Sequence, residues 1–154
     1  MKKRDKSFIL WFKDIAISDI SLVGGKNASL GEMYSKLQSS GVRVPNGFAV
    51  TAYAYRFFIE ASGVDKYIKE RMLNVNMSNM GELASAGGDV RDAIATAPLP
   101  KSLKDAICNA YAQLEKEYGK GVDTAVRSSA TAEDLPDASF AGQQETFLNV
   151  SSIG

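Results

Sequence analysis

The chain has 154 residues, 45% hydrophobic and 23% charged, which are fractions typical of a soluble globular protein. Lys plus Arg and Asp plus Glu both total 18, so the formal net charge is zero and no broad nucleic-acid-binding surface is expected. Histidine is absent and Cys108 is the only cysteine, which excludes a Ser-His-Asp triad, a phosphohistidine and an internal disulfide within these residues.

The N-terminal segment predicts a short buried strand. Its apolar run, Phe8–Phe12, is interrupted by Lys13 and Asp14. A signal-peptide core needs about 7–15 apolar residues and a membrane span about 20, so neither is expected. With a single cysteine, the chain suits a reducing, cytoplasmic setting.

A helix is predicted directly after Gly24-Gly25. Asn27 or Ser29 is its expected N-cap, and Gly41 is its expected end. Its apolar face is expected to hold Leu30, Met33 and Leu37 at helical spacing, with Tyr34 beside them.

Further helices are predicted between the two ends of the chain, with Thr51 and Ser102 as N-caps of the first and the last. Their expected bounds are Thr51 to Gly63, 65–73, about 80–95, and Ser102 to Gly119 or Gly121. The predicted strands are 8–12, 42–50 with a Pro-Asn-Gly turn, 123–128 and 146–150. The expected fold class is α/β (α+β), with a small mixed or antiparallel sheet flanked by helices.

Gly24-Gly25-Lys26-Asn27 is the first motif that suits a phosphate. Glycines let the backbone approach a ligand closely, the N-terminus of a helix favours an anion, and Lys26 adds a positive charge. The motif is not a Walker A sequence. On spacing alone, a turn with a solvated lysine is the simpler interpretation.

Arg127-Ser128-Ser129, at the end of a predicted strand, is the second such motif. The planar fork of the Arg127 guanidinium matches phosphate oxygens. The alternative is an ion pair between Arg127 and Glu133 or Asp134. Two phosphate-type elements in one small chain predict a polyphosphate ligand.

The polar loop 131–144 is either a lid over this ligand or a plain connection. Its carboxylates are irregularly spaced, so a solvated face is a better interpretation than a metal site. No metal ligand is therefore assigned to this chain.

Four ordered blocks carry a resemblance that covers nearly the whole chain: Val23–Met33, Val44–Ala49, Ala125–Asp134 and Ala138–Val150. Together they resemble the N-terminal nucleotide-binding region of the phosphoenolpyruvate synthase (pyruvate, water dikinase) family. The resemblance implies an ATP-grasp-type subdomain. It also implies ATP and Mg²⁺ as cofactors, and the conversion of ATP, pyruvate and water to phosphoenolpyruvate, AMP and phosphate.

The resemblance also implies roles for individual residues. Lys26 corresponds to the family's lysine on the ATP phosphates, and Arg127 to the arginine that stabilises the transferring phosphoryl group. Gly142 falls in the glycine-containing loop thought to cover the triphosphate. The implied partners are a swivelling phosphohistidine domain and a pyruvate-binding barrel. Neither is found in residues 1–154, and the acidic magnesium ligands are also expected outside them.

The whole chain, 1–154, is therefore expected to be the first subdomain of the ATP-binding domain of a larger enzyme, and to be inactive alone. Two alternatives stay open. One is another dikinase-type phosphotransferase, such as a pyruvate phosphate dikinase or an antibiotic-inactivating relative. The block Ala141–Thr146 favours the synthase family over these. The other alternative is a binding module without catalysis.

Overall fold

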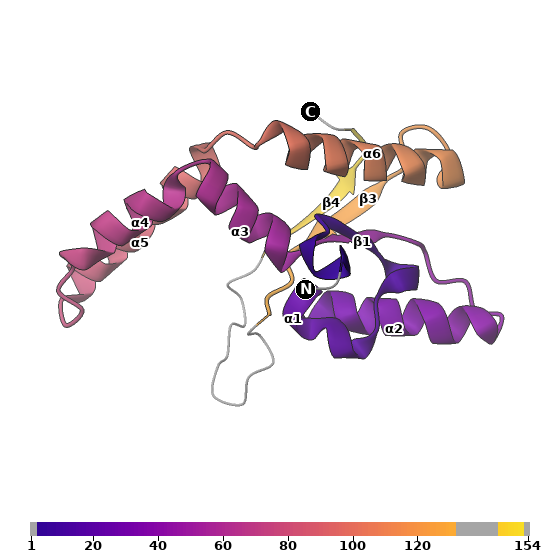
Figure 1. Ribbon diagram of the computed structural model, residues 1–154. Coiled ribbons are helices and arrows are strands. Elements are labelled where there is room, and N and C mark those ends of the chain that lie inside the picture. Colours follow the sequence, from indigo (N-terminus) through magenta and orange to yellow (C-terminus); the bar gives the residue numbers. More distant parts are fainter. Residues whose placement is uncertain (1–2, 132–144, 153–154) are drawn as a thin grey trace. The chain divides into compact units, whose positions relative to one another are not determined.

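A computed structural model describes residues 3–131 and 145–152 (Figure 1). Within these residues the helices are α1 (Ile20–Val23), α2 (Gly25–Ser39), α3 (Ala52–Ala61), α4 (Val64–Leu73), α5 (Met80–Thr96) and α6 (Lys101–Tyr118). The strands are β1 (Ile9–Trp11), β2 (Phe48–Val50), β3 (Thr124–Arg127) and β4 (Thr146–Val150). The expected α/β (α+β) class is confirmed. None of the described helices is long and apolar enough to cross a membrane.

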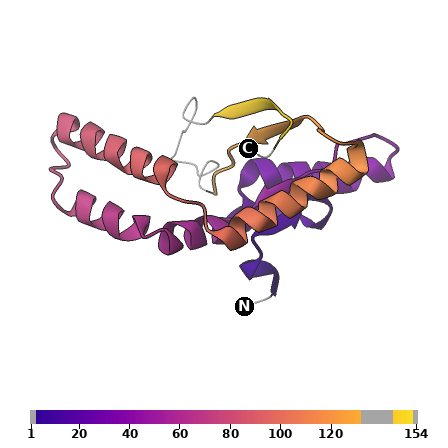
Figure 2. The same ribbon diagram turned by 90° about the horizontal axis from the view of Figure 1, so that it is seen from above.

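The described strands pair as two separate antiparallel ribbons, not as one sheet. In the first ribbon, Leu10 of β1 lies opposite Ala49 of β2. In the second, drawn in orange and yellow in Figure 2, Arg127 of β3 lies opposite Thr146 of β4. The last residue of β3 therefore lies at the loop end of the hairpin, where the connecting residues 128–145 leave.

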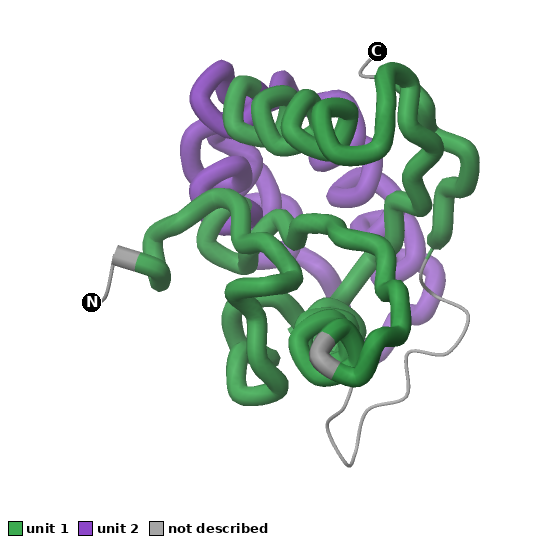
Figure 3. Tube along the Cα trace, turned by 90° about the vertical axis from the view of Figure 1, so that its right-hand side faces the viewer, with its two compact units in different colours: residues 1–54, 105–154 green, residues 55–104 purple. Residues whose placement is uncertain are grey.

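The chain divides into two compact units, coloured separately in Figure 3. The first unit contains residues 1–54 and 105–154, and the second contains residues 55–104. In the second unit, α4 and α5 pack against each other, and Arg71 Nε lies 2.7 Å from Asp89 Oδ2. Both phosphate-type motifs lie in the first unit.

The core of the first unit forms where α2 packs on the turns that follow β1. Buried Ala28 and Gly31 face this core, and a Cβ added at Gly31 would lie 2.6 Å from Ile15 Cβ. The predicted apolar face of α2 is only partly correct: Tyr34 is buried, whereas Met33 and Leu37 are 43% and 38% exposed. At Gly31 the close approach of Ile15 leaves no room for a side chain, so a glycine faces the core there.

The predicted N-cap at Thr51 is confirmed. Its hydroxyl accepts a hydrogen bond from Ala54 N at 3.1 Å and donates one to Ser7 O at 2.6 Å. The prediction for Ser102 is wrong, because α6 begins at Lys101 and the Pro100 carbonyl accepts the first helical bonds. Proline lacks only an amide hydrogen, so its carbonyl can still begin a helix.

An ion pair between Arg4 and Asp19 stabilises the segment that leads into α1. Asp19, 7% exposed, accepts hydrogen bonds from Arg4 Nη1 and Nη2 at 2.8 and 2.7 Å and from Ala16 N at 2.8 Å. The Arg4 guanidinium, helped by the Ala16 amide, lowers the pKa of the Asp19 carboxyl. The carboxylate is thus favoured in the folded state.

Asp19→Asn is expected to lower the free energy of unfolding by about 1–3 kcal/mol near neutral pH, because a buried charged acceptor is lost. The folded-state pKa of Asp19 lies below the value of about 3.9 expected for an unfolded chain. Its contribution is therefore present above that pH and is lost as the pH falls through the folded pKa. Urea unfolding at pH 7 and pH 3 measures both effects.

The matched control is Asp65→Asn, which removes the half-buried partner of the exposed Lys69. Such surface pairs contribute about 0–1 kcal/mol. A destabilisation of Asp19→Asn that is no larger than that of the control, or that is as large at pH 3 as at pH 7, would contradict this assignment.

Candidate functional site

The first motif forms the junction between α1 and α2. Gly24 has φ +80° and ψ 163°, a combination open almost only to glycine, and it is the N-cap of α2. The predicted side-chain caps Asn27 and Ser29 are wrong, because the helix begins earlier, at Gly25. Lys26 is the second residue of α2 and is half-buried. A positive side chain thus lies beside the positive end of a helix dipole.

The second motif, Arg127-Ser128-Ser129, begins at the last residue of β3, at the loop end of the β3–β4 hairpin. Arg127 is exposed and ends β3. Across the described residues, 3–131 and 145–152, no hydrogen bond or ion pair of its guanidinium is seen. Glu133 and Asp134, its alternative partners, lie outside those residues. After it, the Ser128 amide donates to Glu145 O at 3.4 Å, which continues the pairing of the hairpin.

The two motifs, 102 residues apart in sequence, touch each other. The Ser129 hydroxyl donates to Val23 O at 2.9 Å and accepts from Asn27 N at 3.3 Å. Gly25 N donates to Ala130 O at 3.4 Å. A Cβ added at Gly24 would lie 2.3 Å from Ser129 Oγ, so only glycine permits this approach.

This contact limits the distance between the two candidate cations. Lys26 precedes the bonded Asn27, and Arg127 is two residues before the bonded Ser129. Chain geometry then keeps their Cα atoms within about 15 Å of each other. Two long, flexible cationic side chains at that separation can reach one polyphosphate.

The sequence assigned Ser129 no role other than that of a hydroxyl beside Arg127. In the structure this hydroxyl is bonded to the backbone of the first motif. Asn27 acts in the same place, because its side-chain amide donates to Val23 O at 2.9 Å. The role of Ser129 depends on residues more than 100 positions away, which no local pattern reveals. The role of Asn27 differs from the predicted cap because α2 already begins at Gly25.

The remaining predicted site features lie partly outside the described residues. Gly142 and most of the loop 131–144 are among these undescribed positions. Within the part of the chain that the structure describes, no group of three or more Cys, Asp or Glu could hold a metal ion. The expectation that magnesium ligands lie elsewhere therefore stays a prediction.

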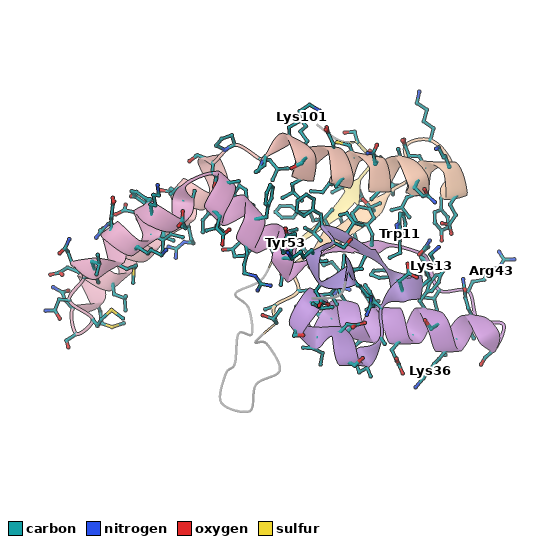
Figure 4. All side chains as sticks on the ribbon, viewed as in Figure 1. Trp11, Lys13, Lys36, Arg43, Tyr53 and Lys101 are labelled. Atoms are coloured by element: carbon teal, nitrogen blue, oxygen red, sulfur yellow. The ribbon has the colours of Figure 1, made fainter. Side chains whose placement is uncertain are left out.

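Two other places could suggest a ligand. A groove between β1 and α6, lined among others by Trp11 and Asn109, has one cation, Lys6. It lacks the paired cations and the helix N-terminus of the apposed motifs. The second place is the pair of aromatic side chains Tyr53 and Trp11, labelled in Figure 4, which could stack on a base. Both are already in contact with other rings: Tyr53 stacks on Phe8, and Trp11 meets Phe48 edge to face. The apposed motifs are therefore the candidate site.

The chain was compared with known families and proteins. The family model described as pyruvate phosphate dikinase, AMP/ATP-binding domain, matches residues 20–153. Phosphoenolpyruvate synthase of Escherichia coli is 51% identical over 145 residues, which cover 94% of this chain and 18% of that protein. The synthase of Synechocystis sp. is 48% identical over 155 aligned residues, 97% of this chain and 19% of the relative.

A relative named probable phosphoenolpyruvate synthase, from Staphylothermus marinus, is 43% identical over 150 residues, 96% of this chain and 18% of that protein. The chain thus spans about a fifth of the length of the relatives it matches. The family match includes both apposed motifs. The chain belongs to the family of pyruvate phosphate dikinase AMP/ATP-binding domains.

Proposed function

We propose that this chain forms the first part of the ATP site of a pyruvate, water dikinase. The observation that carries the proposal is the bonding of Ser129 to Val23 and Asn27, which brings the Lys26 and Arg127 segments together. The membership in an AMP/ATP-binding family supports ATP as the ligand. The names of the relatives support phosphoenolpyruvate formation as the overall reaction.

Lys26 is proposed to bind the ATP phosphates from the N-terminus of α2. Arg127 is proposed to approach the same phosphates from the end of β3 and to stabilise charge on the transferring phosphoryl group. Phosphoryl transfer demands mainly positioning and charge neutralisation, which two converging cations supply. Gly142 is proposed to cover the triphosphate from the loop that follows.

Magnesium, when bound, would neutralise further phosphate charge. The described residues offer no cluster of acidic ligands for it, so its ligands are proposed to lie elsewhere in the enzyme. The chain contains no histidine, so the phosphoryl acceptor must also lie elsewhere. The proposed acceptor is a histidine of a swivelling domain, which passes the group to pyruvate bound in a barrel. A cytoplasmic, gluconeogenic role is proposed together with this reaction.

The 154-residue chain is expected to bind ATP weakly and to form no AMP. Isothermal titration with ATP and magnesium measures the first, and AMP analysis after incubation with ATP and pyruvate measures the second. Lys26→Met should weaken ATP binding about 10- to 150-fold, the loss expected for one hydrogen bond to a charged group. Rapid AMP formation by the chain alone, or equal affinity of the Lys26→Met variant, would contradict the proposal.

The complete gene product distinguishes the remaining alternatives. A water-dependent dikinase releases phosphate beside AMP, whereas a phosphate-dependent dikinase releases pyrophosphate. We expect phosphate, because the relatives named above are synthases. ATP binding without any AMP formation in the complete gene product would favour the non-catalytic binding module instead.

A further inference from the structure

We propose that Ser129 is a positioning residue of this ATP site, whose hydroxyl fixes Lys26 relative to Arg127. The inference rests on the proposed function, because it concerns how the two cations of that site are held. It assigns Ser129 no contact with the nucleotide. Its hydroxyl is bonded to the backbone on either side of Gly24, at Val23 O and Asn27 N; the segment from Val23 to Asn27 is called the Gly24 turn here.

Ser129 replaces a cap that α2 lacks. A helix N-cap normally accepts a hydrogen bond from the second or third helical amide through its own side chain. The N-cap of α2 is Gly24, which has no side chain. The third amide, Asn27 N, donates to Ser129 Oγ instead, across 102 positions of sequence. The start of α2, which includes Lys26, is thus capped by Ser129, two residues after Arg127.

The same hydroxyl also acts as a hydrogen-bond donor to the first motif. It donates to Val23 O, the last residue of α1, at 2.9 Å. A further hydrogen bond between the two segments, from Gly25 N to Ala130 O, is longer, at 3.4 Å. Removing the hydroxyl would therefore break the two shorter of these three bonds and loosen the register between the Lys26 and Arg127 segments.

Gly24 makes the arrangement specific. The Ser129 hydroxyl occupies the place where any other residue at 24 would carry its Cβ. A loss of the hydroxyl therefore opens a small gap beside the turn, into which the start of α2 can shift. Displacements of about 1 Å at a reacting centre can cost about 100-fold in rate.

The test is a double-mutant cycle on phosphoryl transfer in the complete gene product. Ser129→Ala is expected to lower kcat for AMP formation about 10- to 100-fold, with the KM for pyruvate unchanged. In a Lys26→Ala background the same substitution should have little further effect, because the cation that it misplaces is gone. All four proteins are compared at low temperature, so that a less stable variant remains folded.

Thr51→Ala is the matched control. Thr51 has the same bonding pattern: its hydroxyl accepts from a helix amide and donates to a distant carbonyl. Both Ser129→Ala and Thr51→Ala should lower the melting temperature, but only Ser129→Ala should lower kcat. If Ser129→Ala reduces kcat no more than Thr51→Ala, or by the same factor with and without Lys26, the positioning role is refuted.

The outcome also separates this inference from the proposed function. If the unsubstituted gene product neither binds ATP nor forms AMP, the proposed function fails. If it does both and Ser129→Ala behaves like the control, only the inference about Ser129 fails.

Discussion

Gly24→Ala is expected to lower the free energy of unfolding by about 2–6 kcal/mol and to abolish ATP binding. The backbone at Gly24 has φ +80° and ψ 163°, which costs a residue with a Cβ about 1–3 kcal/mol. The new Cβ would also lie 2.3 Å from Ser129 Oγ and 2.8 Å from Ala130 O. The two apposed segments would have to separate. Urea unfolding and an ATP titration measure the two effects.

Gly41→Ala provides the control for backbone strain. Gly41 has φ +80° as well, but a Cβ added there meets nothing within 4 Å. It should therefore cost only about 1–2 kcal/mol and leave ATP binding unchanged. Equal stability of the two variants, or full ATP binding by Gly24→Ala, would show that the contact between the two motifs does not hold the site together.

Arg127→Ala is expected to lower the rate of phosphoryl transfer in the complete gene product about 1,000-fold or more, the effect typical of an arginine that stabilises a transferring phosphoryl group. Stability should change little, because Arg127 is exposed at the end of β3. Arg127→Lys should restore only part of the rate, since an ammonium lacks the planar fork. Single-turnover formation of the phosphoenzyme measures the step directly.

Arg43→Ala is a suitable control for general charge effects. Arg43 is exposed in the same unit, and its side chain points away from the ribbon (Figure 4). This variant should transfer the phosphoryl group at the unsubstituted rate. A normal rate in Arg127→Ala would remove Arg127 from the mechanism, whatever its effect on binding.

Local patterns predicted much of the fold. Thr51 was identified as a cap because threonine is favoured at the residue before a helix, whereas the same rule failed at Ser102, where α6 begins one residue earlier. The helix α2 was predicted, but its buried face only in part: Tyr34 is buried, whereas Ile15 approaches closely enough to place Gly31 in the core and leave Met33 exposed. The size of a neighbour that is distant in the fold cannot be read from helical spacing.

In the candidate site, too, local patterns predicted the individual residues but not the contacts between distant segments. Lys26 and Arg127 were singled out from their own chemistry and from the family resemblance, and the family is confirmed. The segments that carry them are joined through Ser129, whose partner Asn27 lies 102 residues away. Such a contact has no local signal. Gly24 is the one sequence feature that indicates this contact, since a glycine is favoured where another backbone approaches closely.

The most direct test of the central claim is an experimental structure with magnesium and a non-hydrolysable ATP analogue bound. The claim predicts that the Lys26 ammonium and the Arg127 guanidinium both lie within hydrogen-bonding distance of the triphosphate, with Ser129 still bonded to the Gly24 turn. A triphosphate contacted by neither side chain, or by one while the other points to a different face, would contradict it.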